Sequence, residues 1–436
     1  MKIIWIVNMV FPKIAKKLGA ATSASGGGGA CPSRGPPPSA SGGWLLDLAD
    51  GISADPNVEL TVMTYYDGEF KDIKVDNIRY ILFPGGGNRL LFDSNKTAED
   101  CKKALELCQP DLVHIHGTEY APGYEMLKVC GDVPVLLTIQ GILRRISKEY
   151  YGGLTFNERL KCLKLKEILT MKTPTAYKML YSRNAEREEK VLKQVKYVTG
   201  RTDWDKAVML SVNPNLKYFR CNYNLRKEFY ESEKWSLESC ERHTVFSSSA
   251  LYSLKGLHIE VKAIALLKKK YPDIKLYVPG GCAENGKIKN PSGYIKYINR
   301  LIKKYGLEDN IIFTGSISPS EVAKRLRKAN VFVVSSAVEG ASASLCEAMM
   351  IGTPSVSSFR GGMTDLLTDR VNGFTYDYSE YPMLACRIDE LFSNDKLACE
   401  FSKRTIPLAE ERHKREKNPK DMIEVYNEVI ANERKD

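Results

Sequence analysis

Residues 331–350 read VFVVSSAVEGASASLCEAMM, and this stretch decides the fold. Its first four residues are apolar and mostly β-branched, a run typical of a buried strand. A loop of small residues follows, and a helical pattern begins near Leu345. A buried strand that leads through a short loop into a helix is the unit from which parallel α/β sheets are built. The stretch therefore predicts a parallel sheet, with Glu339 at the carboxyl end of one strand.

The same alternation recurs along the chain. Apolar runs predict a first series of strands at residues 2–10, 58–65, 78–83, 112–116, 135–139 and 197–199, and a second series at 244–247, 275–278, 311–314, 331–334 and 355–357. Helical patterns lie between them at residues 44–51, 98–107, 257–270, 292–305, 319–328 and 345–351. Two such series predict an α/β protein with two doubly wound, Rossmann-like parallel sheets that face each other across a cleft.

The domain limits follow from this division. We expect one domain at residues 1–225, a second at 226–418, and a last helix within 419–436 that packs back on the first domain. Residues 23–43 depart from the pattern, because SASGG occurs at both ends of a stretch rich in Gly, Pro and Ser. Such a stretch cannot bury a core, so we expect a loop insertion after the first strand.

Composition narrows the class of protein. The chain has 436 residues, of which 43% are hydrophobic and 27% charged, and this excludes a largely disordered or collagen-like protein. No apolar run approaches the roughly 20 residues that span a bilayer. The 11 cysteines include no CxxC pair, which favours reduced thiols. We therefore expect a cytoplasmic protein, with peripheral membrane association as an alternative.

Positive charge is concentrated in residues 144–196, which contain 14 Lys or Arg and 6 Asp or Glu. Within them, residues 159–169 show Leu160 and Leu163 on one face of a predicted helix, with lysines beside them. One interpretation is an ordinary solvated helix face. The other is a surface that rests on an anionic membrane or an anionic acceptor. Nucleic acid is disfavoured, because no aromatic residues are interleaved with the charges.

The strand–helix unit at residues 331–350 has groups that suit a sugar diphosphate. Glu339 lies in the loop and Glu347 lies about one turn inside the helix. Between them, the backbone N–H groups of Ala343, Ser344 and Leu345 point outward from the helix N-terminus, which favours an anion. The phosphates would contact these amides. Hydroxyls of the sugar would bind one carboxylate, and hydroxyls of the ribose would bind the other. The alternative is a pair of unrelated surface acids.

Neighbouring motifs favour the ligand site. The paired glycines Gly361 and Gly362 allow the backbone to approach a ligand closely. Lys255 begins a helix after the first strand of the second domain, where an ammonium group can neutralise phosphate charge. In the first domain, His116 and Gln140 each follow a strand and are expected at the edge of the same cleft.

With these motifs the chain resembles the retaining glycosyltransferases of family 4, and the resemblance extends over nearly its whole length. Residues 339–349 with Gly361 and Gly362 are its specific part, and PDLVHIHG at residues 110–117 supports it. The resemblance implies the GT-B fold, a nucleotide-diphosphate sugar bound mainly by the second domain, and an acceptor bound mainly by the first. It implies no metal and no cofactor other than this donor substrate.

The resemblance also implies roles for individual residues. Glu339 would contact the donor sugar, Glu347 the ribose and Lys255 the diphosphate. Backbone at Ser316 and Ile317 would meet the base. Gly42 and Gly43 would form a loop over the phosphates, with Ala343, Ser344, Leu345, Gly361 and Gly362 completing the donor site.

Three positions depart from the family pattern. Ala250 stands where many members have an arginine, so a phosphate contact is missing or comes from elsewhere, and Arg201 is the candidate substitute. Gln140 stands where a histidine is common, and an amide can donate a hydrogen bond but cannot act as a general base. Asp365 occupies a place often held by glutamate.

The sequence thus predicts a retaining transferase that moves a hexose, UDP being the favoured carrier, to a hydroxyl of a saccharide or lipid-linked acceptor in surface polysaccharide or glycolipid assembly. Glu339, Lys255 and Gln140 are its candidate catalytic residues. The alternatives are a nucleotide-sugar epimerase of the same fold and a nucleotide-binding protein without turnover. Asp203-Trp204-Asp205 has the form of a metal-binding pair but is better explained as a helix cap.

Overall fold

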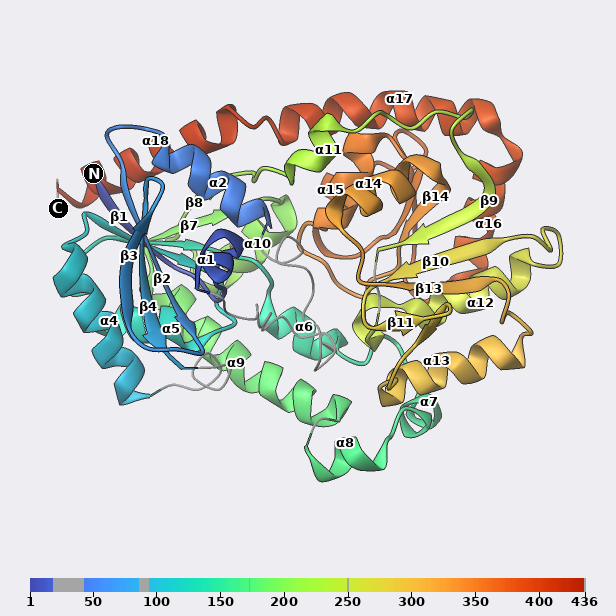
Figure 1. The fold of residues 1–436 in the computed structure, drawn as a ribbon, viewed down its shortest axis with the longest axis horizontal. Coiled ribbons are helices and arrows are strands. Elements are labelled where there is room, and N and C mark those ends of the chain that lie inside the picture. The colour runs from blue at the N-terminus through green and yellow to red at the C-terminus, as the bar shows by residue number, and fades with distance from the viewer. Residues whose placement is uncertain (19–42, 86–93, 172, 249–250, 435–436) are drawn as a thin grey trace.

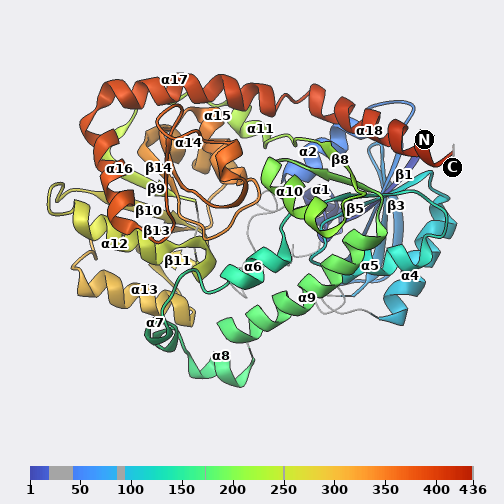
Figure 2. The same ribbon diagram turned by 180° about the vertical axis from the view of Figure 1, so that it is seen from behind.

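The structure is a computed structural model that describes residues 1–18, 43–85, 94–171, 173–248 and 251–434. Two sheets lie side by side along the longest axis of the molecule, each with helices on both faces (Figures 1 and 2). The expected α/β architecture is therefore confirmed. The proposed loop insertion lies outside the described residues, apart from its last residue, Gly43, with which the helix α2 (Gly43–Ser53) begins.

The first sheet has eight strands in the order β3-β4-β2-β1-β5-β6-β7-β8. They are β1 (Lys2–Ile6), β2 (Glu59–Tyr66), β3 (Lys71–Val75), β4 (Ile78–Pro84), β5 (Leu112–His116), β6 (Val135–Thr138), β7 (Tyr197–Gly200) and β8 (Lys217–Arg220). Neighbours pair in parallel except for the antiparallel β3 and β4. Strands are added on one side of β1 first and then, from β5 onward, on its other side. In doubly wound sheets a ligand crevice forms at this point between the two strands.

The second sheet has six parallel strands in the order β13-β10-β9-β14-β15-β16. They are β9 (Glu241–Ser247), β10 (Lys275–Pro279), β13 (Ile311–Gly315), β14 (Ala329–Val334), β15 (Ser355–Ser358) and β16 (Phe374–Tyr376), and a separate antiparallel pair consists of β11 (Ala283–Glu284) and β12 (Lys287–Ile288). Here the order reverses between β9 and β14.

The helices complete three cores. Two cores, one on each face, bury the apolar strand residues of the first sheet. One large core buries those of the second sheet. Besides α2, the helices are α1 (Pro12–Lys17), α4 (Asn95–Cys108), α5 (Ala121–Val129), α6 (Leu143–Glu149), α7 (Phe156–Lys161), α8 (Leu165–Leu169), α9 (Pro174–Gln194), α10 (Asp203–Val212), α11 (Lys227–Glu231), α12 (Leu257–Leu267), α13 (Gly293–Lys304), α14 (Pro319–Lys328), α15 (Ala343–Ile351), α16 (Tyr381–Ser393), α17 (Asp395–Arg412) and α18 (Lys417–Glu433), with 3-10 turns η1 (Ser253–Lys255) and η2 (Gly361–Asp365).

The last two helices run back along the molecule, α17 beside the second sheet and α18 beside the first (Figure 1). The hydroxyl of Tyr426 on α18 accepts a hydrogen bond from Trp5 Nε1 at 2.9 Å and lies 2.7 Å from His114 Nδ1. Both partners are in the centre of the first sheet. The C-terminal helix α18 therefore forms part of the hydrophobic core of the first sheet.

Several predicted elements need correction. The first strand ends at Ile6 instead of residue 10, and strands β3, β8 and β16 were not predicted. Residues 159–169 do not form one helix, because α7 ends at Lys161 and α8 begins at Leu165, with Cys162 buried between them. The expected reduced thiols are found at the free cysteines of the described residues, whereas Cys282 is disulfide-bonded. None of the described helices is long and apolar enough to cross a membrane.

Candidate functional site

Lys255 and Glu339 meet at the point where the second sheet reverses its order. Lys255 ends η1 after β9, and Glu339 lies in the loop after the adjacent β14. The ammonium group of Lys255 donates to Glu339 Oε1, and the hydroxyl of Ser336 donates to the same oxygen at 2.9 Å. The two predicted residues thus form an ion pair whose side chains are 25% and 16% exposed. Partial shielding from water strengthens the Coulomb attraction between the two charges.

Two glycines hold the backbones that carry this ion pair. Gly256 has φ 79°, and a Cβ there would lie 1.8 Å from the carbonyl oxygen of Ser335. Gly361 has φ 66°, and a Cβ there would lie 1.9 Å from the carbonyl oxygen of Glu339. Only glycine combines this backbone conformation with so close an approach. The tight packing fixes both turns relative to the ends of β9 and β14.

The surroundings of Lys255 keep it charged. Burial by itself lowers the pKa of its ammonium group, but the charge of Glu339 and the hydrogen bond between them outweigh burial and raise that pKa. Tyr252 and Tyr181 lie close enough to interact with it electrostatically. Tyr181 comes from α9 in the first half of the chain, so both halves contribute to this cluster, and sequence reasoning did not identify either tyrosine.

Glu347 has a different environment. It lies on α15 and is 7% exposed, and its Oε1 accepts hydrogen bonds from Arg226 Nε at 3.0 Å and Arg226 Nη2 at 2.7 Å. Burial raises the pKa of this carboxyl, and the Arg226 guanidinium opposes the rise. Arg226 belongs to the segment that joins the two sheets and carried no signal in the sequence. Each of the two predicted carboxylates therefore has its own cation.

The N-terminus of α15 is partly capped from within. The hydroxyl of Ser342 accepts a hydrogen bond from the Leu345 N–H at 3.4 Å and lies 2.9 Å from the hydroxyl of Ser344. The Leu345 amide, one of the three that we expected to bind phosphate, therefore already has an acceptor. Ala343 is exposed and Ser344 half-buried at the same helix end.

The other predicted donor residues lie on neighbouring loops of the second sheet. Ser316 follows β13 and bonds the carbonyl oxygen of Gly281 through its N–H at 2.9 Å and its hydroxyl at 3.2 Å. Ile317 packs on the core beside it. A Cβ at Gly362 would lie 2.1 Å from the Gly340 carbonyl oxygen and 2.6 Å from Thr202 Oγ1, so this glycine permits contact between the two halves.

From the first half, Gln140 and Arg201 reach this contact. Gln140 follows β6 and donates from Nε2 to the backbone carbonyl oxygen of His116 at 3.3 Å. The backbone carbonyl oxygen of Gln140 accepts from Arg201 Nη2 at 3.3 Å. The Arg201 guanidinium lies 4.9 Å from the centre of the Tyr223 ring. A Cβ at Gly340 would be 3.5 Å from the Gln140 carbonyl oxygen, which places the loop with Gln140 directly opposite the loop with Glu339.

His116 lies deeper than we expected. It is 3% exposed and packs with its ring centre 4.3 Å from that of Trp5 and 3.9 Å from that of His114. Burial lowers the pKa of His116 to about 3, so its imidazole is neutral near pH 7. Glu119 lies on the loop that follows His116, and a Cβ at Gly117 would lie 2.3 Å from Glu119 Oε2 and 3.4 Å from Gln140 Cδ.

Glu119 is a half-buried acid that sequence reasoning missed. Its Oε1 accepts from the Gly141 N–H at 3.0 Å, and its buried Oε2 has no hydrogen-bond partner in the described part of the chain. Burial raises the pKa of this carboxyl, while backbone hydrogen bonds and the charge of Arg201 oppose the rise. The HG-x-E pattern at residues 116–119, directly after β5, is a local signal that could have indicated it.

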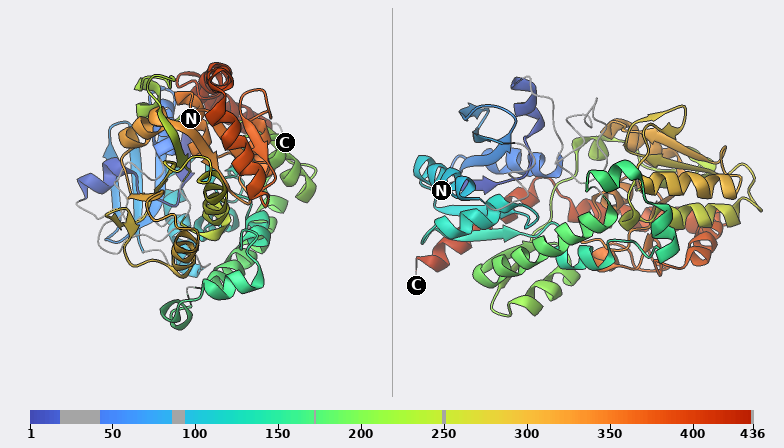
Figure 3. Two further views of the ribbon diagram at one scale, coloured as in Figure 1. Left: turned by 90° about the vertical axis from the view of Figure 1, so that its right-hand side faces the viewer. Right: turned by 90° about the horizontal axis from the view of Figure 1, so that it is seen from below.

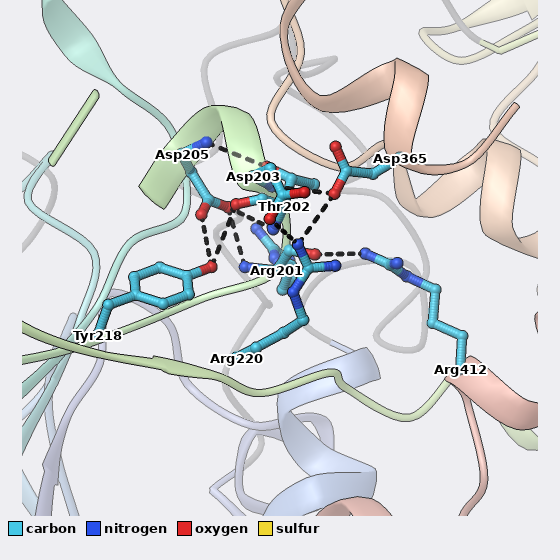
Figure 4. A network of polar contacts seen from close by, with 8 residues as sticks. All are labelled: Arg201, Thr202, Asp203, Asp205, Tyr218, Arg220, Asp365 and Arg412. Atoms are coloured by element: carbon cyan, nitrogen blue, oxygen red, sulfur yellow. Dashed lines mark hydrogen bonds and ion pairs between the residues drawn. The ribbon is translucent and has the colours of Figure 1, made fainter. Parts of the chain in front are cut away.

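A network of polar contacts joins the two halves beside Arg201 (Figure 4). The Asp203 N–H donates to Asp365 Oδ2 at 2.9 Å, Arg220 Nη2 donates to the same oxygen at 3.2 Å, and Arg412 Nη2 donates to the Arg201 carbonyl oxygen at 2.7 Å. Asp365, one of the positions that depart from the family pattern, thus binds the first half of the chain.

Asp203 and Asp205 belong to the start of α10. Thr202 caps this helix, its hydroxyl accepting from the Asp205 N–H, while Asp205 Oδ2 accepts from the Thr202 N–H. This capping box accounts for Asp205, whereas Asp203 forms an ion pair with Arg220. Within the described ranges no three His, Cys, Asp or Glu residues are grouped to hold a metal ion. Gly42 and Ala250 lie outside the described residues.

Part of the chain matches a known protein family. Residues 230–408 match the family "Glycosyl transferases group 1". The matched region makes up less than half of the chain and includes Lys255, Glu339 and Glu347. A curated relative, D-inositol 3-phosphate glycosyltransferase of Corynebacterium urealyticum, is 26% identical over 178 residues, which are 40% of this chain and 41% of that protein.

Two solved structures resemble the whole chain. Sucrose-phosphate synthase from Thermosynechococcus elongatus has a TM-score of 0.72 at 17% identity and covers 99% of both chains. Anabaena Alr3699/HepE, solved in complex with UDP-glucose, has a TM-score of 0.62 at 16% identity and covers 98% of this chain and 100% of that one. These likenesses confirm the expected GT-B fold. The chain spans less than half of the length of the curated relatives that it matches.

Proposed function

We propose that the protein is a retaining glycosyltransferase that moves a hexose from a nucleotide-diphosphate sugar to an acceptor hydroxyl. The Lys255–Glu339 pair supports this most strongly, because it lies at the switch point of the group 1 region and combines a lasting positive charge with a carboxylate. At such a switch point doubly wound sheets bind their ligands. The acceptor is a saccharide or a lipid-linked sugar, as in surface polysaccharide or glycolipid assembly.

In the proposed reaction the acceptor oxygen bonds to the anomeric carbon while the bond from that carbon to the diphosphate oxygen breaks. The acceptor attacks on the face from which the diphosphate leaves, so the anomeric configuration is retained. The proton of the acceptor hydroxyl passes to the departing phosphate. Lys255 would exchange part of its pairing with Glu339 for the diphosphate and stabilise its developing charge. Glu339 would then accept from hydroxyls of the donor sugar, and Gln140 would position the sugar from the opposite loop.

The remaining donor contacts follow from the same placement. Glu347 would hold the ribose with Arg226 beside it, and the backbone at Ser316 and Ile317 would meet the base. Arg201, which stands at the junction of the halves, would supply the second cation of the diphosphate site. We favour UDP, because HepE of the same fold was solved with UDP-glucose. We propose that the reaction needs neither a metal nor a further cofactor.

The direct test is a thermal-shift screen of UDP, GDP and ADP sugars, followed by a transfer assay with the best donor. We expect stabilisation by one nucleotide class, and release of its nucleoside diphosphate that increases when an acceptor is added. A changed sugar without any acceptor would instead identify an epimerase. Thermal stabilisation by a nucleotide sugar without turnover, whichever acceptor is added, would indicate a binding protein.

A substitution then tests the role of Lys255. We expect Lys255→Met at saturating donor to lower turnover by about 100-fold or more, since one preorganised charge is removed from the leaving group. Lys269→Met changes an exposed lysine of the same region and serves as the matched control. Unchanged turnover in Lys255→Met would refute the leaving-group role.

A further inference from the structure

A group of large apolar side chains is exposed on the segment that links the two halves. They belong to α7, α8, the turns after them and the start of α9, and we call them the α7–α9 apolar surface: Phe156, Leu160, Leu163, Leu165, Ile168, Leu169, Met171, Tyr177 and Met179. Leu165, Leu169 and Met171 are 72%, 75% and 76% exposed. Soluble monomers rarely expose contiguous apolar patches of this kind without a partner.

The surface lies at the edge of the molecule. Figure 1 shows α7 and α8 below the two sheets, and Figure 3 shows the same segment projecting from the body in the first view. A cavity of about 210 Å³ between α7 and the start of α9 is lined by Leu154, Phe156, Leu160, Leu163, Pro174 and Tyr294. The apolar side chains of α7 thus lie beside the first residues of α9, and α8 follows α7 directly along the chain.

The charged side chains exposed on residues 156–171 of this surface are positive. Residues 156–171 contain two acids, Glu158 and Glu167, and both bind the second half of the chain. Glu158 Oε1 accepts from Lys262 Nζ at 3.0 Å and from the Tyr297 hydroxyl at 2.6 Å, and Glu167 Oε1 accepts from the Gly293 N–H at 3.1 Å. The exposed charges on the same residues are those of Lys161 and Lys166.

We propose that the α7–α9 apolar surface docks on an anionic lipid bilayer. Apolar side chains would enter the boundary between headgroups and acyl chains, while the lysines contact anionic headgroups. The positive excess of residues 144–196 acts in the same direction. Docking would hold both halves near the bilayer, because this segment contacts both. The proposal goes beyond the proposed transfer reaction and does not rest on it.

Vesicle sedimentation tests the proposal with the full chain. The probes are phosphatidylcholine vesicles with and without phosphatidylglycerol. We expect the wild-type protein to bind the anionic vesicles more tightly, with an affinity that falls as salt rises. Absence of binding to anionic vesicles at low salt would overturn the proposal, and equal binding to both kinds of vesicle would overturn the role of the lysines.

Variants locate the surface. Leu165→Gln/Leu169→Gln/Met171→Gln should weaken vesicle binding about tenfold or more, since three exposed apolar side chains that would enter the bilayer are lost. Lys161→Gln/Lys166→Gln should weaken binding to the anionic vesicles by about fivefold per lysine. The matched control, Val371→Gln/Met383→Gln/Leu408→Gln, changes three exposed apolar residues elsewhere and should bind like the wild type. Wild-type binding by the first variant would refute the proposal.

Two further measurements keep the result distinct from other causes. Sedimentation velocity tests whether a second copy covers the surface: a wild-type dimer that the first variant converts to a monomer, without vesicle binding by either, would overturn the proposal. Thermal unfolding should show the same midpoint for all variants, because every changed side chain is exposed. Donor turnover is measured separately, so a failed transfer assay leaves the vesicle result interpretable.

Discussion

At the scale of single residues, the Lys255–Glu339 ion pair should be visible in stability as well as in catalysis. Lys255→Met and Glu339→Gln each leave a partly buried polar group without its partner, and each should cost on the order of 1–3 kcal/mol of unfolding free energy. In a double-mutant cycle measured by urea denaturation, the double variant should lose less than the sum of the two. Strict additivity would show that the two side chains do not interact.

Gly256 should tolerate no side chain. Gly256→Ala combines φ 79° with a Cβ 1.8 Å from the Ser335 carbonyl oxygen, so the turn that carries Lys255 must shift. We expect a loss of about 2–4 kcal/mol together with weaker donor binding. Gly306→Ala is the matched control, since it has φ 63° but nothing within 4 Å of the added Cβ, and it should cost only about 1 kcal/mol. Equal effects in both variants would contradict the packing argument.

Glu260 should make stability depend on pH. Burial raises its pKa to about 7 from an ordinary value of 4.5, although the hydroxyls of Ser335 and Ser247 oppose the rise. The folded state therefore binds a proton that the unfolded state releases, and unfolding free energy falls as pH rises from about 4.5 to 7. Glu260→Gln should reduce this fall by roughly 1–3 kcal/mol. The exposed Glu308→Gln should leave the profile unchanged, and an unchanged profile in Glu260→Gln would contradict the assignment.

At the scale of elements, buried strands were the most predictable feature. Runs such as 331–334 are apolar on both faces and need no partner to be recognised. Strands β3 and β8 were missed because they lie at the two edges of the first sheet, where side chains such as those of Lys71 and Lys217 are exposed and no continuous apolar run remains. The helix expected at residues 159–169 is broken because buried Cys162 packs its carbonyl against Gly293 of the second half.

The placement of the candidate site residues on the fold was predictable in part. Glu339, Glu347 and Lys255 follow strands or lie at helix starts, and this local pattern is enough to place them near the carboxyl ends of the strands. Their partners were not predictable, because Arg226, Tyr181 and Glu119 come from distant segments that only the fold brings together. The depth of His116 depends in the same way on Trp5, which is more than a hundred residues away in the chain.

The packing of α18 on the first sheet gives a prediction at this scale. Tyr426→Phe removes a buried hydroxyl that pairs with Trp5 Nε1 and His114 Nδ1, and leaves both without that partner. We expect a loss of about 1–3 kcal/mol in unfolding free energy. Tyr305→Phe at the surface is the matched control. If thermal unfolding gave equal midpoints for both variants, α18 would not contribute to the core of the first half in solution.

At the scale of the whole molecule, glycines and charged networks join the two halves. Gly362 allows the 361–365 turn to approach Thr202, and Asp365 binds the start of α10 and Arg220. The loop that carries Gln140 is thereby held opposite the loop that carries Glu339. In this arrangement, a donor bound to the second half, as we propose, would be within reach of residues from the first half.

The most direct test of the central claim is calorimetric titration of a nucleotide-diphosphate sugar, such as UDP-glucose, into the wild-type protein, Lys255→Met and the control Lys269→Met. We predict saturable binding by the wild type and the control, and binding at least about tenfold weaker by Lys255→Met, because the diphosphate loses its cation. Equal affinity in all three proteins, or no binding of any nucleotide sugar by the wild type, would contradict the account.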